Sequence, residues 1–238
     1  MIWFGSDCGK RGPAAKFRRG TATSQRIVKP RKCARLIGVL CLLGPLLAAC
    51  GGDGGRRAVS PYAPLSGPAC VRLLAERGIA TSPWQGGTAA CPIDTPVQAP
   101  AGTIAGFTPP LDTSCAMLVA WSDFERELDR IARATMGSPV AAVRHYGSFA
   151  CRGMTGNAGR RSLHAQARAL DIAAFELADG RTVTVLAGWS GPADQRRFLR
   201  AVARAACGRF SVVLTPNSDR FHQDHLHVDI GPWRKCGI

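Results

Sequence analysis

Three of the five histidines in this 238-residue chain lie within six positions, in the stretch FHQDHLHVDIG at 221–231. Side chains alternate between the two faces of a β-strand, so His225 and His227 would point to one side, about 6–7 Å apart. The other side would face a hydrophobic core through Leu226, Val228 and Ile230. This spacing would allow one imidazole to bind a metal ion while its neighbour acts as an acid or base. Two exposed or two structural histidines would show the same spacing.

A second stretch, SLHAQARALDIAAF at 162–175, contains His164 and Asp171. These residues offer a nitrogen and an oxygen ligand of the kind that zinc accepts. Asp171 would start a buried strand, where a carboxylate is costly unless it is paired or bound to a metal. A turn cap or an ion pair with Arg168 would also satisfy this carboxylate.

Apolar periodicity and turn signals predict the elements that must position these residues. We expect helices at 69–78, 115–136 and 192–207, and strands at 140–149, 171–177, 181–186, 211–214 and 225–230. Thr113 or Ser114 can cap the second helix, and a Pro/Gly/Thr-rich connection is expected at 81–110. Helices and hairpin strands without a regular βαβ rhythm indicate an α+β fold, with a mainly antiparallel sheet and flanking helices in a single domain.

The beginning of the chain has the layout of an export signal. Residues 1–49 carry ten basic side chains and one acidic one, which is most of the formal charge of +15. An apolar run at 36–49 is too short to span a bilayer comfortably. It ends in Leu47-Ala48-Ala49-Cys50-Gly51, which is similar to a bacterial lipobox with Cys50 as the lipidated residue. We also weigh a plain secretory signal, and a twin-arginine signal at Arg18-Arg19.

These features divide the chain into a lipoprotein signal at 1–49, a flexible tether at 50–67 and a domain at 68–238. Translation could start near Val28, since the leader that follows it has ordinary proportions. The expected location is the cell envelope, anchored to a membrane. Nucleic-acid binding is not expected, because no basic stripe interleaved with aromatic residues accompanies the charge.

Six cysteines remain in the body after the predicted signal and lipidation site: Cys70, Cys91, Cys115, Cys151, Cys207 and Cys236. An even number in an exported chain predicts three disulfides, although six cysteines permit 15 pairings. We favour the pairs Cys70–Cys91, Cys115–Cys151 and Cys207–Cys236. No CxxC pair is present, so a zinc-thiolate cluster is not expected.

The pattern S-x-H-(x)6-D, followed some fifty residues later by H-x-H, resembles that of the lysostaphin, D-alanyl-D-alanine metallopeptidase and hedgehog-type zinc proteins. A closer resemblance, over roughly 70–236, is to the bacterial extensin-like C-terminal domain family. It rests on SLHAQARALDIAAF, on YGSFACR at 146–152 and on VVLTPNSDRFHQDHLHVDIG at 212–231. The peptidases often have glycine where this chain has Ala167.

The resemblance implies that one zinc ion is bound by His164, Asp171 and His227, and that His225 is the acid/base or transition-state partner. Asp229 or Asp224 could then fix a ring tautomer. His222 is either a further pocket group or a loop histidine in contact with water. Arg152 and Arg161 could grip a substrate carboxylate, or belong to a solvated basic surface.

Taken together, these inferences predict a lipid-anchored, zinc-dependent peptidase or amidase that acts on peptidoglycan peptides. The alternative is a binding or structural module of the same fold, which keeps the zinc but does not hydrolyse its ligand.

Overall fold

The computed structural model describes residues 60–238. The predicted signal at 1–49, the lipidation site Cys50 and residues 51–59 of the tether lie outside the described residues.

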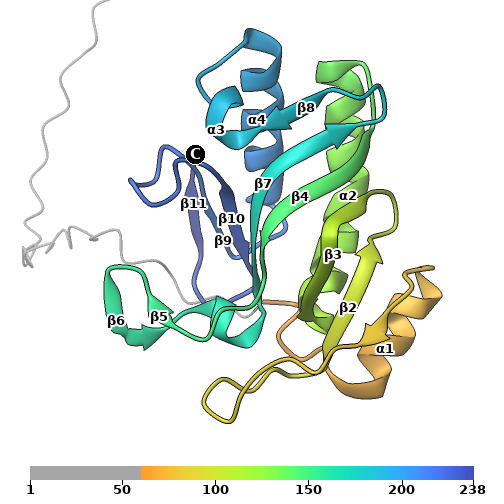
Figure 1. Cartoon of the computed structure of the whole chain (residues 1–238), viewed down its shortest axis with the longest axis vertical. Coiled ribbons are helices and arrows are strands. Elements are labelled where there is room, and N and C mark those ends of the chain that lie inside the picture. Colours follow the sequence, from red (N-terminus) through yellow and green to blue (C-terminus); the bar gives the residue numbers. More distant parts are fainter. Residues whose placement is uncertain (1–59) are drawn as a thin grey trace, which may run out of the picture. The chain divides into compact units, whose positions relative to one another are not determined.

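A nine-stranded sheet is the centre of the domain (Figure 1). Its strands are β1 (Ser82–Pro83), β2 (Pro96–Ala101), β3 (Gly106–Ser114), β4 (Val140–Gly147), β7 (Ala169–Leu177), β8 (Thr182–Thr184), β9 (Val212–Leu214), β10 (Leu226–Asp229) and β11 (Lys235–Gly237). The order is β1-β2-β3-β4-β7-β10-β9-β11, with β8 paired to β7. Only the β3/β4 and β9/β11 pairs are parallel among these strands. A separate hairpin consists of β5 (Gly153–Met154) and β6 (Asn157–Arg161).

Two long helices, α2 (Cys115–Met136) and α4 (Ala193–Ala206), pack side by side behind the sheet in the view of Figure 1. The hydroxyl of Ser114 caps α2 by accepting from the amide of Met117 at 3.3 Å, and Gly137 ends it with φ +71°. Shorter elements are α1 (Gly67–Glu76), α3 (Val185–Gly188) and the 3-10 helix η1 (Leu163–Gln166). Within residues 60–238, no helix combines the length and apolar character needed to span a bilayer.

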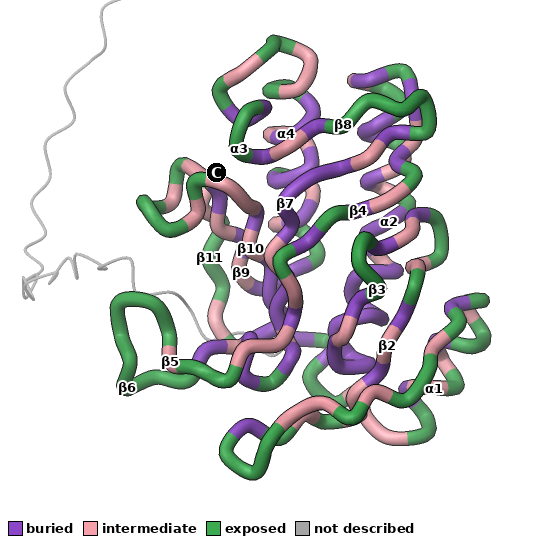
Figure 2. Tube along the Cα trace, viewed as in Figure 1, coloured by how far each residue is buried: buried purple, intermediate pink, exposed green. Residues whose placement is uncertain are grey.

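The hydrophobic core lies between these helices and the sheet (Figure 2). Aromatic rings connect the layers: Phe124 packs edge-on against Phe210 with centroids 5.6 Å apart, and Phe175 against Phe198 at 5.2 Å. Leu226, Val228 and Ile230 are each 1% exposed, as their alternation in the sequence predicts. The α+β class, the mainly antiparallel sheet and the single domain are therefore confirmed.

The connection expected at 81–110 is wrong in part, because it contains β1, β2 and the first half of β3. Proline is unusual inside a sheet because it lacks a backbone N–H. In this domain Pro100 lies at a register shift in β2, between Ala99 and Ala101. Pro109 and Pro110 follow the point where the pairing of β3 with β4 ends, at Thr108. Pro100, Pro109 and Pro110 are therefore placed where the ladders are interrupted.

Residues 60–67, predicted to belong to the tether, are part of the folded domain. Tyr62 is 7% exposed and joins the core, and its hydroxyl donates to Asp123 at 3.0 Å. Burial first and then the charge of Asp123 raise the pKa of Tyr62 to about 12. The boundary at residue 68 therefore falls one residue after the start of α1.

The protein has three disulfides, as predicted, but two of the favoured pairings are wrong. The bonds join Cys70 to Cys115, Cys91 to Cys151 and Cys207 to Cys236. The favoured pairs Cys70–Cys91 and Cys115–Cys151 joined cysteines that are close along the chain. In the fold, α1 packs against the start of α2 and brings the buried Cys70 and Cys115 together, which leaves Cys91 for Cys151.

Candidate metal centre

The face of β7 and β10 that points away from the core carries the candidate site. In the antiparallel register His227 lies opposite Asp171, while Leu226 pairs with Ile172 and Val228 with Leu170. Because side chains alternate, the apolar partners enter the core and the histidine and the aspartate meet on the other face. The residues two positions either side of Asp171 on β7 are alanines, Ala169 and Ala173, which are small enough to leave room around the carboxylate.

His164 reaches the same place from η1. The hydroxyl of Ser162 accepts from the amide of His164 at 3.3 Å and starts this short helix. Ala167 ends it at φ +50°, a left-handed conformation that glycine adopts more readily. The carbonyl of Ala167 accepts from the amide and the hydroxyl of Ser114, at 3.1 and 2.8 Å, and from the hydroxyl of Thr113 at 3.1 Å. The turn that presents His164 is thus fastened to the start of α2.

Three donor atoms meet in what we call the His/Asp cluster: His164 Nε2, Asp171 Oδ and His227 Nδ1. The Nε2–Nδ1 distance is 3.2 Å, the distance from Nδ1 to Asp171 Oδ1 is 2.9 Å, and that from Nε2 to Asp171 Oδ2 is 3.2 Å. Atoms bound to one zinc ion at its usual bond lengths, in a tetrahedral arrangement, lie about 3.3 Å apart. The donor set and its spacing therefore fit a zinc ion.

The other nitrogen of each imidazole has a fixed partner. His164 Nδ1 donates to the carbonyl of Ser148 at 3.1 Å, and His227 Nε2 lies 3.4 Å from Asp229 Oδ2. The second oxygen of Asp229 accepts from the amide of Gly231 at 2.9 Å. These outer contacts leave the second ring nitrogen of each imidazole facing the cluster, where its lone pair would bind a metal ion, as outer partners of metal ligands usually do. Asp229, which the sequence predicts as an outer partner, lies beside His227 in this arrangement.

Two lone pairs and a carboxylate at this spacing repel one another unless something positive lies among them. Burial by itself would raise the pKa of Asp171, but hydrogen bonds with His164 and His227 hold it far below its usual range. Burial would lower the pKa of His227, but its contacts with Asp171 and Asp229 raise it to about 9. Both shifts have the same physical cause: the three donor atoms together favour a positive charge among them.

His225 lies at the edge of the cluster. Its Nδ1 is 2.8 Å from Asp224 Oδ1, and its Nε2 is 3.6 Å from Asp171 Oδ1. The ring of Tyr146 packs edge-on against it with centroids 5.9 Å apart. The hydrogen bond with His225 lowers the pKa of Asp224, so this carboxylate remains charged and orients the imidazole. Asp224, the other aspartate considered as an outer partner, therefore acts on His225.

His222 belongs to the same group of rings, with centroids 5.1 Å from His225 and 5.9 Å from His227. Its Nδ1 lies 2.7 Å from Asp219 Oδ1. Burial lowers the pKa of His222, against the hydrogen bond and charge of Asp219, which raise it. His222 is therefore beside the cluster and hydrogen-bonded, as the pocket reading proposes.

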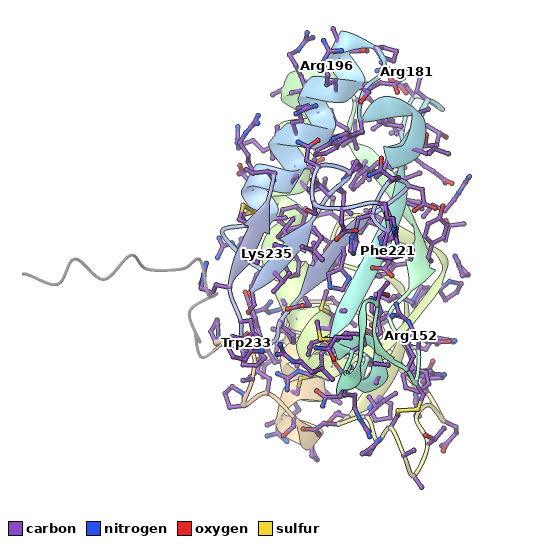
Figure 3. The ribbon with its side chains drawn as sticks, turned by 90° about the vertical axis from the view of Figure 1, so that its left-hand side faces the viewer. Arg152, Arg181, Arg196, Phe221, Trp233 and Lys235 are labelled. Carbon is purple, nitrogen blue, oxygen red and sulfur yellow. A yellow bond between two sulfur atoms is a disulfide. The ribbon has the colours of Figure 1, made fainter. Side chains whose placement is uncertain are left out.

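Arg152 and Arg161 both precede η1 along the chain, and their hydrogen bonds are to groups outside the His/Asp cluster. Arg152, labelled in Figure 3, donates to the carbonyl of Gly153 at 3.3 Å and to the hydroxyl of Thr155 at 3.1 Å. Arg161 donates to the carbonyl of Ala90 and lies 3.8 Å from the sulfur of Cys91. Both side chains line a separate cavity.

Sequence reasoning missed Ser148, Asp219 and Tyr146. Ser148 acts through its backbone carbonyl, which no residue type indicates. Asp219 is three residues before His222, a spacing that a turn can bring into contact. Tyr146 lies on β4, which joins the site only through its pairing with β7.

The fold and the site define a small, disulfide-containing α+β domain with two histidines and an aspartate converging on one face of its sheet. The model of the family described as extensin-like protein C-terminus matches residues 68–237, and the chain belongs to this family. The comparisons with curated proteins and with solved structures gave no match.

Proposed function

We propose that this protein is a zinc-dependent hydrolase of the bacterial cell envelope that cleaves an amide bond in peptidoglycan peptides. The observation that carries this proposal is the convergence of His164 Nε2, Asp171 Oδ and His227 Nδ1 at the mutual distances expected of ligands to one zinc ion. The likeness of the S-x-H-(x)6-D and H-x-H pattern to zinc peptidases supports the same function.

His164, Asp171 and His227 would hold the ion, and three protein ligands are typical of catalytic rather than structural zinc sites. When bound, zinc would supply a water molecule with a pKa lowered toward about 7 and would polarise the carbonyl of an amide.

His225 would move the protons of the reaction. Its Nδ1 donates to Asp224, so its Nε2 is the nitrogen that faces the cluster and exchanges a proton there. As a base, Nε2 takes a proton from the attacking water, and as an acid it returns this proton to the nitrogen of the leaving amine. Water thus adds across the C–N bond to give a carboxylic acid and an amine.

A hydrolase needs a site that water can reach, and the His/Asp cluster meets this requirement. The side chains of Asp171, His225 and His227 are 16%, 13% and 12% exposed, so solvent and substrate can reach the cluster. His164 is nearly buried at 5% and serves as the fixed side of the site.

Export and membrane anchoring are part of the proposal. Three disulfides are typical of proteins from oxidising compartments. The sequence Leu47-Ala48-Ala49-Cys50 is similar to a lipobox and would attach the protein to a membrane through Cys50.

The test is incubation of the purified protein with peptidoglycan sacculi, and mass spectrometry of the released fragments. Zinc-loaded protein should release new amines and carboxylates, chelator should stop the release, and added zinc should restore it. Release that is equal with and without chelator, or no release at all, would refute the proposal.

A variant separates chemistry from metal binding. His225→Ala should keep its zinc and lose about a hundredfold or more in turnover. Arg197→Ala, which changes an exposed residue of α4, should keep both. Full turnover in His225→Ala would contradict the role of this histidine.

A further inference from the structure

A cavity of about 310 Å³ lies between the β5/β6 hairpin and the loop that contains Cys91. The Cys91–Cys151 disulfide joins its two sides. Its lining is Ala90, Cys91, Cys151, Arg152, Gly153, Ala158, Gly159 and Arg161. We call this cavity the arginine pocket. Its size falls within the range of small-ligand sites, about 300–1,000 Å³.

The charge of the arginine pocket is not balanced by its surroundings. Arg152 and Arg161 form no ion pair with a carboxylate among residues 60–238. The two stretches around the pocket, 84–93 and 148–170, contain no aspartate or glutamate, and Asp94 and Asp171 are the acidic residues that follow them. Each guanidinium makes its recorded hydrogen bonds through Nη1, and a guanidinium has five N–H donors in all. The pocket therefore favours an anion.

The small residues of the lining leave room for a ligand. Ala90, Gly153, Ala158 and Gly159 occupy little volume. The cavity can admit a carboxylate together with a small side chain, and a guanidinium can bind a carboxylate through two parallel hydrogen bonds.

The arginine pocket adjoins the His/Asp cluster along two segments. The amide of Ser162 donates to the carbonyl of Arg152 at 3.2 Å, and the amide of Ala150 donates to the carbonyl of His164 at 3.1 Å. Arg161 is three residues before His164, so their Cα atoms are at most about 11 Å apart. An extended peptide of a few residues covers this distance.

We infer that the arginine pocket binds the free carboxylate of a short peptide with a small C-terminal residue. Where this peptide continues to the His/Asp cluster, the inference rests on the proposed function and gives the substrate class: peptides with a free carboxylate a few residues from the amide bond that is cut.

The experiment measures binding without turnover, on purified protein kept metal-free with a chelator. The probe is the peptide Gly-Ala-Ala with a neutral fluorophore on its N-terminus, compared with the same peptide ending in a C-terminal amide. The acid should bind about tenfold more tightly than the amide, since only the acid forms charge-assisted hydrogen bonds. Equal affinities would overturn the inference.

Substitutions of the two arginines show whether the peptide binds in the arginine pocket. Arg152→Gln and Arg161→Gln should each reduce the ratio of acid to amide affinity toward one, and Arg152→Lys should retain part of it because it keeps the charge without the planar fork. Arg197→Gln removes the same charge from α4 and should leave the ratio unchanged. A ratio that survives in both pocket variants, with thermal unfolding unchanged, would overturn the assignment.

Inorganic phosphate distinguishes the two common anion classes. Phosphate should compete with the acid peptide only weakly, and competition stronger than that of the unlabelled peptide would overturn the assignment to a carboxylate. These results are independent of hydrolysis: a failure to bind the acid leaves the zinc hydrolase proposal intact, and a failure to release fragments from sacculi leaves the pocket intact.

Discussion

His164 lies only three residues after Arg161, yet the two side chains are held in different ways. His164 is nearly buried, and its turn is fastened to the start of α2 through the carbonyl of Ala167. Arg161 is exposed on a two-stranded hairpin outside the main sheet. The His/Asp cluster thus depends on the sheet and core, whereas the arginine pocket depends on a hairpin and one disulfide.

This contrast separates two requirements of a hydrolase. Groups that hold a metal ion must keep their positions within a fraction of an ångström, which a register of paired strands provides. Groups that select a substrate can lie on exposed loops, which tolerate change without loss of the fold. We therefore expect changes in one region to leave the other largely intact.

Asp171→Asn should have the largest effect, because it removes the charged ligand between two histidines. Apparent zinc-binding free energies of about 10–16 kcal/mol suggest a loss of about 4 kcal/mol for one of three protein ligands, or about a thousandfold in affinity. Competition with a chromophoric chelator measures this loss. Asp179→Asn, an exposed aspartate beside Arg181, is the control and should bind zinc normally.

Leu226→Ala tests the support behind the cluster. Leu226 is 1% exposed and lies between His225 and His227. Its truncation should lower the free energy of unfolding by about 2–5 kcal/mol. Met154→Ala, on the exposed hairpin, should change this free energy by less than about 0.5 kcal/mol. If urea unfolding gave similar losses of free energy for the two variants, the contrast between the core behind the cluster and the exposed hairpin would be contradicted.

Replacing both Cys91 and Cys151 by serine should weaken the binding of the acid peptide in the arginine pocket. The bond closes a loop between residues 60 positions apart, so its loss should cost about 2–4 kcal/mol of stability. The ratio of acid to amide peptide affinity should fall, while zinc affinity should stay within about a factor of three under conditions where the variant is folded. A parallel loss of zinc would show that the regions are coupled.

Zinc affinity should rise with pH. Burial would lower the pKa of His227, but Asp171 and Asp229 raise it from 6.5 to about 9, so below pH 9 the ion must displace a proton. Affinity should increase about tenfold per pH unit up to about pH 9 and then level off. Chelator competition at several pH values measures this slope, and a flat profile between pH 7 and 9 would contradict the raised pKa.

The same raised pKa has the opposite effect on the stability of the metal-free protein, which should fall as the pH rises. A raised pKa means that protonated His227 stabilises the fold fully below pH 6.5, and that this stabilisation is lost as the pH rises through 9. Unfolding of the chelated protein by urea should therefore require less denaturant at pH 9.5 than at pH 6. Removal of the metal should also reduce stability most at high pH.

Local sequence patterns were sufficient to predict much of the scaffold. Alternation in 225–230 predicted which side chains of β10 enter the core, and apolar spacing predicted α2 with a cap at Thr113 or Ser114, of which Ser114 is the cap. The pattern around His164 and Asp171 also indicated residues that the fold brings together with His227. The scaffold predictions succeeded because each depends on the periodicity of one element, whereas the roles of the three clustered residues stay predictions.

The remainder depends on contacts between distant segments. The pairing of Cys70 with Cys115 follows from the packing of α1 on α2, which no spacing of cysteines reveals. Proline content concealed β2 and β3, because it does not show that the prolines fall where pairing is interrupted. Whether Arg152 and Arg161 face the cluster or another cavity depends on the course of the hairpin.

The carbonyl of Ala167 accepts hydrogen bonds from Thr113 and Ser114 while its turn presents His164. A motion that moves the whole turn away from α2 would break these bonds and free the Ser114 hydroxyl that caps the helix. Such an opening of the site would therefore loosen the first helical turn. The exchange of the Ser114 amide with deuterated solvent would report on how often this event occurs.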